Sequence, residues 1–108
     1  MDLAELVQNH STLLTSSTIE GLPEAWIGIV DDLCKNVTEF GTEAKFTQIA
    51  EEHGCMRIRF EVDNLYRAMV VSCVREAENR AMRTCQKCGS ACEKLYKRRT
   101  VLCGECSK

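Results

Sequence analysis

The residues of this chain best suited to chemistry are its cysteines, which gather near the C-terminus. Five of the eight cysteines in the 108 residues fall within residues 85–108. Four of them form two C-x-x-C pairs, Cys85 with Cys88 and Cys103 with Cys106. Because one tight turn can aim both sulfurs of a pair at the same point, two pairs supply the four thiolates of a closed, tetrahedral zinc site.

The spacing of the two pairs favours a structural Zn²⁺ ion. The 14 residues between them are one fewer than the usual spacer of about 15–20 residues, and they are long enough for a short hairpin. Gly89 and Gly104 each follow a cysteine of a pair, where a tight turn needs backbone freedom. We therefore predict that residues 85–108 form a zinc-ribbon-like module with Cys85, Cys88, Cys103 and Cys106 as ligands.

Disulfide and redox alternatives for these cysteines are less favoured. The first ten residues, MDLAELVQNH, lack the basic and apolar regions of a secretory signal, which predicts a reducing, cytoplasmic setting in which structural disulfides are rare. No βαβ pattern surrounds either pair, as a thioredoxin-like motif would require. Cys92 could replace Cys85 or Cys88 as a ligand, but its x-x-x spacing fits less well, and we expect a free thiol there.

The charge of the chain is divided unevenly between its halves. Residues 1–56 carry a formal charge of −8 and residues 57–108 carry +6, although the whole chain carries only −2. The halves could simply attract one another, or either could meet a partner of opposite charge. The candidate residues for binding a protein partner are the adjacent acids Asp31, Asp32, Glu51 and Glu52. The alternative interpretation is that these acids simply face solvent. The candidate residues for binding nucleic acid are Lys94, Tyr96, Lys97, Arg98 and Arg99. The alternative interpretation is that the basic residues among them offset the negative charge of the zinc-bound thiolates.

Two helices are expected in the first 40 residues. Residues 2–14 read as a helix with Asp2 and Glu5 at its start. Pro23 suits the first position of a second helix. Its apolar residues recur with helical spacing and predict a stripe that faces the core: Trp26, Val30, Leu33 and Val37, with Cys34 beside them.

The remaining elements place the cysteines. Residues 42–54 could be a helix capped by Thr42 or the first strand of a hairpin, whereas the alternation of residues 55–62 predicts a strand. In a hairpin that turns at residues 53–54, Ile49 would face Ile58 and Thr47 would face Phe60 on the core side. Residues 63–83 read as the longest helix, capped by Asp63, which leads directly to the first C-x-x-C pair. These elements predict an α+β body over residues 1–84, followed by the zinc-binding tail over residues 85–108.

The order of these motifs resembles a group of small phage and prophage proteins. The resemblance rests on a Trp-containing helix with the Leu33-Cys34 pair, the segment QIAEEHGCMRIRF, and the two cysteine pairs of the tail. His53 departs from the pattern, which usually has an aromatic residue there, and so does Ile58 between two arginines. The resemblance implies a phage-type setting, with the host cytoplasm as the location, and supports a hairpin for residues 44–62. It implies no biochemical activity.

A binding protein is therefore the expected function class. Neither His10 nor His53 has a sequence partner that makes a catalytic triad or a metal site, and no glycine-rich phosphate loop is present. No apolar run approaches the ~18 residues of a membrane span. The leading hypothesis is a non-enzymatic zinc protein that binds a host protein, such as an inhibitor of host defence of the anti-CRISPR kind. The alternative is a nucleic-acid-binding regulator that uses the basic tail, and no pattern predicts an oligomeric state.

Overall fold

The computed structural model describes residues 2–15, 17–41, 44–52 and 55–89, and within them it confirms an α+β fold. The elements in chain order are α1 (Leu3–Asn9), β1 (Ile19–Glu20), the 3-10 helix η1 (Glu24–Trp26), α2 (Ile27–Glu39), β2 (Lys45–Glu52), β3 (Cys55–Glu61) and α3 (Arg67–Met82). The predicted zinc ribbon over 85–108 lies outside the described residues except for 85–89. No helix in the described part is long and apolar enough to cross a membrane.

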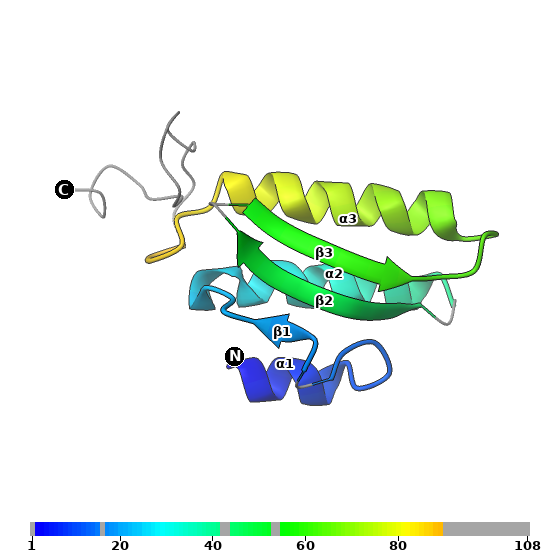
Figure 1. Ribbon diagram of the computed structural model, residues 1–108, viewed down its shortest axis with the longest axis horizontal. Helices are drawn as coiled ribbons and strands as arrows, with labels where there is room; N and C mark the ends of the chain where they lie inside the picture. Colours follow the sequence, from blue (N-terminus) through cyan, green and yellow to red (C-terminus); the bar gives the residue numbers. More distant parts are fainter. Residues whose placement is uncertain (1, 16, 42–43, 53–54, 90–108) are drawn as a thin grey trace.

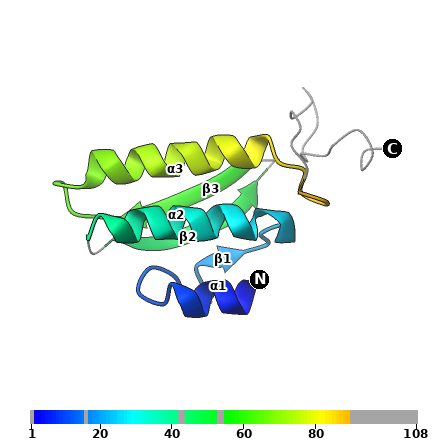
Figure 2. The ribbon, with the colours of Figure 1, turned by 180° about the vertical axis from the view of Figure 1, so that it is seen from behind.

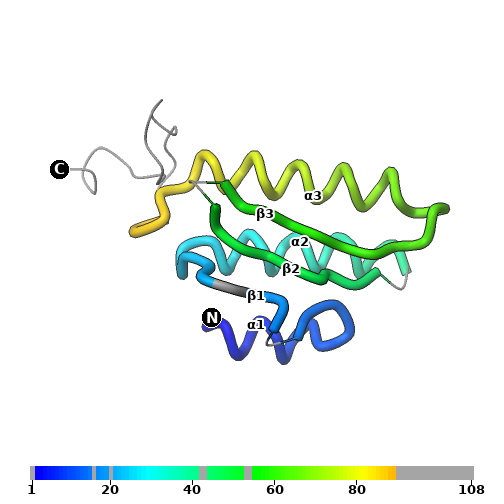
Figure 3. The backbone as a smooth tube through the Cα atoms, viewed as in Figure 1, coloured from blue at the N-terminus to red at the C-terminus, as the bar shows by residue number. Residues whose placement is uncertain are grey.

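The body is a three-stranded sheet with two long helices on one face. The strand order is β1-β2-β3, with β1 parallel to β2 and β2 antiparallel to β3. Figure 1 shows the sheet in front of α2 and α3, and the opposite view in Figure 2 shows the same two helices in front of the sheet. α2 and α3 pack against each other in opposite directions, so the start of α2 lies near the end of α3. The short helix α1 lies beside β1 (Figure 3).

The predicted apolar stripe of the second helix forms the centre of the core. Trp26, Val30, Leu33 and Val37 are all buried, as their helical spacing predicts. The sheet and α3 contribute the facing side chains, among them Phe46, Ile49, Met56, Val70, Val74, Ala77 and Ala81. The cap predicted for α1 is also confirmed, because the backbone N–H of Glu5 donates to Oδ1 of Asp2 at 2.8 Å.

The hairpin is confirmed, with one correction to its register. Ile49 pairs with Ile58, as predicted, but Phe46 rather than Thr47 pairs with Phe60. A bulge between Phe46 and Gln48 inserts one extra residue into β2, so Thr47 is exposed and Phe46 is buried. The register predicted for Thr47 assumed strict alternation, which a bulge interrupts.

Two helix boundaries and one strand differ from the prediction. α1 ends at Asn9 rather than at residue 14, and α3 begins at Arg67, so Asp63 does not cap it. The polar run after α1 contains β1, whose short pairing with β2 is extended by two backbone hydrogen bonds, from Phe46 N to Leu13 O (3.0 Å) and from Ile49 N to Thr18 O (2.8 Å). A strand of two residues is too short to show a period of two in the sequence.

We predict that stability depends strongly on Trp26 and Phe46 and less on Phe60. Truncation of Trp26 or Phe46 to Ala should lower the free energy of unfolding by about 3–5 kcal/mol, because both side chains are almost fully buried. Phe60→Ala should cost less, since Phe60 is only half-buried. Urea unfolding measures these differences, with Leu65→Ala as the control because Leu65 is 80% exposed. A Trp26→Ala variant as stable as this control would show that the core is assigned wrongly.

Candidate metal centre

The first predicted pair of zinc ligands lies on a tight turn. The backbone N–H of Gly89 donates to the carbonyl oxygen of Cys85 at 2.9 Å and closes the turn. Gly89 has a φ of +80°, a conformation that side-chain-bearing residues rarely adopt, which confirms the prediction that the turn needs a glycine here. Cys85 is buried and Cys88 is exposed. The C-x-x-C-Gly sequence thus folds into a turn compatible with two sulfur ligands of one metal ion.

Trp26 fixes the cysteine turn to the body of the protein. The Trp26 Nε1–H donates to the carbonyl oxygen of Thr84 at 3.3 Å, and Thr84 immediately precedes Cys85. The hydroxyl of Thr84 in turn donates to the Arg80 carbonyl at 2.7 Å, which continues the end of α3 into the turn. A Cβ atom added to Gly89 would lie 3.9 Å from Cβ of Ala25, so the turn lies close to η1. In Figure 3 the chain leaves α3 and passes the start of α2.

The other predicted tail residues fall outside the part of the chain that the structure describes. These are the ligands Cys103 and Cys106, the spare Cys92, Gly104, and the basic and aromatic candidates Lys94, Tyr96, Lys97, Arg98 and Arg99. Within residues 2–15, 17–41, 44–52 and 55–89, no group of three or more His, Cys, Asp or Glu side chains could hold a metal ion. The described residues therefore contain two of the four proposed ligands, on one turn.

The remaining described cysteines belong to the body. Cys34 is fully buried, as predicted, and burial together with the nearby Asp31 carboxylate raises the pKa of its thiol to about 12. Burial also raises the pKa of Cys73, which packs against the core, and Cys55 is partly exposed, as expected. A thiol with a raised pKa is protonated at neutral pH, so Cys34 and Cys73 are poor nucleophiles and poor metal ligands.

The structure separates the four acids proposed as a protein-binding surface. Asp31 is buried, contrary to the expectation of an exposed acid, whereas Asp32 is exposed. Nη1 of Arg80 lies 2.7 Å from Oδ2 of Asp32. Glu51 and Glu52 lie at the end of β2, where Glu52 is 3.8 Å from Arg57. The adjacent acids of each pair do diverge, as expected of regular structure, so the two helical acids cannot act together at the surface.

Asp31 is held by His10, which follows the end of α1, and by Lys35, one turn later on α2. Its Oδ1 lies 2.8 Å from Nε2 of His10, and its Oδ2 lies 3.0 Å from Nζ of Lys35. Burial by itself raises the pKa of Asp31, but the hydrogen bonds from His10 and Lys35 outweigh it, and the pKa lies below its ordinary value. The sequence does carry a signal for this arrangement. Ile27, Asp31 and Cys34 have the i, i+4, i+7 spacing of a buried stripe. Lys35 lies one turn after Asp31, within reach of its carboxylate.

The His10–Asp31 pair shows half of the geometry of a catalytic triad. A buried carboxylate orients an imidazole, which the sequence analysis did not foresee because 21 residues separate the two. The Nε2 that would activate a nucleophile is, however, the atom that faces Asp31. The nearby thiol of Cys34 is buried and has a raised pKa. The pair therefore ties the end of α1 to α2, and we assign it a structural role.

A groove beside the cysteine turn carries three arginines. It has a volume of 770 Å³ and lies between the start of α2 and the second half of α3. Arg75, Arg80 and Arg83 line it on the α3 side, and Gly28 and Ile29 line it on the α2 side. Thr84 and Gly89, which lie on either side of the first cysteine pair, also line it, so the groove borders the cysteine turn. In the sequence these arginines fall in the C-terminal half of the longest predicted helix, where cations suit the helix dipole, and no sequence pattern indicates a groove there.

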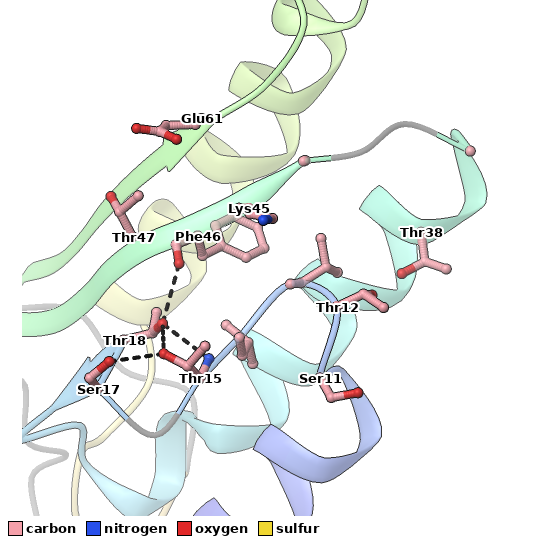
Figure 4. Close-up of a pocket in the computed structure, with 14 residues that line it drawn as sticks. Ser11, Thr12, Thr15, Ser17, Thr18, Thr38, Lys45, Phe46, Thr47 and Glu61 are labelled. Carbon is pink, nitrogen blue, oxygen red and sulfur yellow. Dashed lines mark hydrogen bonds between the residues drawn. The ribbon is translucent and has the colours of Figure 1, made fainter.

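A larger hollow of 940 Å³ lies at the opposite end of α2 (Figure 4). Several hydroxyl groups line it, but those of Thr15, Ser17 and Thr18 are already hydrogen-bonded to one another. The Thr18 hydroxyl lies 3.1 Å from Oγ1 of Thr15 and donates to the Phe46 carbonyl at 3.3 Å, and Oγ1 of Thr15 lies 3.0 Å from Oγ of Ser17. These bonds hold the turn before β1 against β2. We therefore assign this hollow no ligand.

We predict that the Asp31 carboxylate stabilises the fold in a pH-dependent way. Asp31→Asn should lower the free energy of unfolding at pH 7 by about 1–3 kcal/mol, because it weakens two interactions of a buried group. Since the pKa of Asp31 is lowered in the folded state, its stabilisation is fully present above the unfolded pKa of about 3.9 and is lost as the pH falls through the folded value. The stability deficit of the variant should shrink accordingly.

Urea unfolding between pH 7 and pH 2 measures this difference. Glu39→Gln is the matched control, because Glu39 is an exposed acid on the same helix that forms no ion pair with a described residue. It should change stability by less than 0.5 kcal/mol or so across the range. A deficit for Asp31→Asn that stays constant down to pH 2 would contradict the assignment.

The comparisons with known proteins give no family for this chain. No family model, no curated protein and no solved structure matches it. Its function is therefore argued from the geometry of its own residues.

Proposed function

We propose that the protein is a non-enzymatic binding protein whose C-terminal module is held by a structural Zn²⁺ ion. The observation that carries the metal proposal is the turn from Cys85 to Gly89, with its closing hydrogen bond and its glycine at positive φ. Cys85 and Cys88 would hold one side of the ion, and Cys103 and Cys106 the other. When bound, the ion would fix four thiolates in a closed tetrahedron, with no position left for a reacting water.

We propose nucleic acid as the partner, which reverses the order of the two hypotheses from the sequence. The leading hypothesis needed an acidic surface, but Asp31 is buried against His10 and Lys35, and Asp32 faces Arg80. The basic half of the chain, by contrast, gains a surface. Arg75 and Arg83 are exposed, line one groove and form no ion pair with any described residue. The tail carries four further basic residues, Lys94, Lys97, Arg98 and Arg99.

The second candidate partner is a host protein, with inhibition of a host defence system as the role. It is favoured by the exposed acids that remain in the N-terminal half. Asp2, Glu5, Glu24 and Glu39 are exposed on α1, η1 and α2, where Lys35 is the one basic residue among positions 2–41. Charge reversal at Glu24 and Glu39 should slow association with such a partner, whereas reversal in the tail should not.

We predict one zinc ion per chain, held by the four cysteines of the two pairs. Cys85→Ser or Cys106→Ser should remove the metal, whereas Cys92→Ser and Cys73→Ser should keep it and serve as controls. Because the binding free energy of such sites is about 10–16 kcal/mol, loss of the ion should unfold the module. Elemental analysis and native mass spectrometry measure the content. Two disulfides in place of the metal would refute the proposal.

The partner is tested with labelled nucleic acid at several salt concentrations. If phosphate contacts dominate, the logarithm of the binding constant should fall linearly with the logarithm of the salt concentration. The triple variant Lys97→Glu, Arg98→Glu, Arg99→Glu should bind more weakly and with a shallower salt slope, while it keeps its zinc. Absence of binding by the wild-type protein, combined with saturable binding of a host protein that Glu24 and Glu39 control, would favour the second candidate.

A further inference from the structure

We infer that the groove between α2 and α3 is a binding site for the phosphate backbone of nucleic acid. The inference rests on the proposed nucleic-acid function and assigns it a surface in the body of the protein, separate from the basic tail. The groove is bounded by the first turn of α2, by the exposed side of the second half of α3 and by Gly89 of the cysteine turn.

Two of the three arginines of the groove, Arg75 and Arg83, lie in a row of polar residues along one side of α3. Ser72, Arg75, Asn79 and Arg83 follow one another at intervals of three or four residues, which places them on one face of the helix. Arg75 and Arg83 are eight positions apart, so the row extends about 12 Å at a rise of 1.5 Å per residue. Since successive phosphates of a DNA strand advance about 3.4 Å along the axis, such a row can face more than one phosphate.

The favourable interaction of cations with the negative end of a helix accounts for only two of the three arginines in the groove. Arg80 and Arg83 lie in or next to the last turn of α3, where that effect operates. Arg75 lies about two turns earlier, where it has faded. The opposite wall contains Gly28, an exposed residue whose missing Cβ would meet no atom within 4 Å, so the wall leaves room for a ligand. The arginine guanidinium also has the planar geometry that matches phosphate oxygens in pairs.

The groove also contains its own counter-charge. Asp32 of α2 holds Arg80 at 2.7 Å, and Glu76 lines the groove between Arg75 and Arg80. Arg80 is therefore paired within the protein, while Arg75 and Arg83 form no ion pair with a described residue, although the charge of Arg75 also acts on Glu78. This arrangement has a testable consequence: removal of the Asp32 charge should release Arg80 for a phosphate and should strengthen binding.

We predict opposite effects for two changes in the groove. The double variant Arg75→Gln, Arg83→Gln should weaken binding of a fluorescein-labelled 20-nucleotide oligo-dT about 25-fold at 0.1 M salt. The estimate follows from two phosphate contacts, each of which contributes a salt slope of about 0.7 for single strands. Asp32→Asn should instead tighten binding about fivefold, as one added contact would. Glutamine is used because it is a good helix former.

The experiment is a fluorescence-anisotropy titration of oligo-dT and of a 20-base-pair duplex at several salt concentrations. The matched control is Arg59→Gln, Arg67→Gln, which removes the same charge from exposed arginines without described ion pairs, on β3 and at the start of α3. It should weaken binding less than threefold or so and leave the salt slope unchanged, since it loses no contact. Thermal unfolding and zinc content establish that all variants are folded.

Three results would separate the proposals. Weaker binding by the groove variant together with tighter binding by Asp32→Asn supports the groove. Wild-type binding that the groove variant and its control reduce equally, or that only the tail variant reduces, overturns the groove and leaves nucleic-acid binding in place. Failure of the wild-type protein to bind either probe overturns both.

Discussion

A buried hydrogen-bond donor connects the core of this protein to the cysteine turn. The indole of Trp26 lies in the centre of the core with no exposed surface, so its N–H needs an acceptor inside the protein. That acceptor is the carbonyl oxygen of Thr84, at 3.3 Å, and the next residue is the first proposed zinc ligand. Because the largest core side chain and the cysteine turn share this contact, the position of the turn is set by the packing of the body.

The antiparallel pairing of α2 and α3 determines which charged side chains lie close together. It places the start of α2, with its open position at Gly28, against the basic end of α3. Arg80 then reaches Asp32 across the two helices, while Arg75 and Arg83 line the groove and form no ion pair with a described residue. The core, the placement of the cysteine turn and the proposed phosphate site thus depend on one helix pair.

The sequence predicted those features that depend on local periodicity. The stripe from Trp26 to Val37 follows from a spacing of 3.6 residues and the second hairpin strand from a spacing of 2. The pairing of Ile49 with Ile58 follows from a turn placed at residues 53–54, because the pattern of residues 42–54 alone also allows a helix. The glycine after Cys88 follows from the geometry of a turn. Features that depend on contacts between distant residues were missed. The burial of Asp31 requires His10, 21 positions away, and the groove requires two helices whose facing residues are far apart in the chain. The bulge at Thr47 and the two-residue β1 interrupt or fall below the period that a sequence pattern can reveal.

The most direct test of the account is an NMR measurement of the Trp26 indole N–H in the zinc-loaded protein and after chelation. Since this group bonds to the residue before Cys85, loss of the metal should shift its resonance and accelerate its exchange with solvent. The backbone amides of Val30 and Leu33 should stay protected, because both residues lie in the buried core of the body. An indole resonance that is unchanged by chelation would contradict the link between the core and a metal centre. A purified protein that contains no zinc would contradict the metal centre itself.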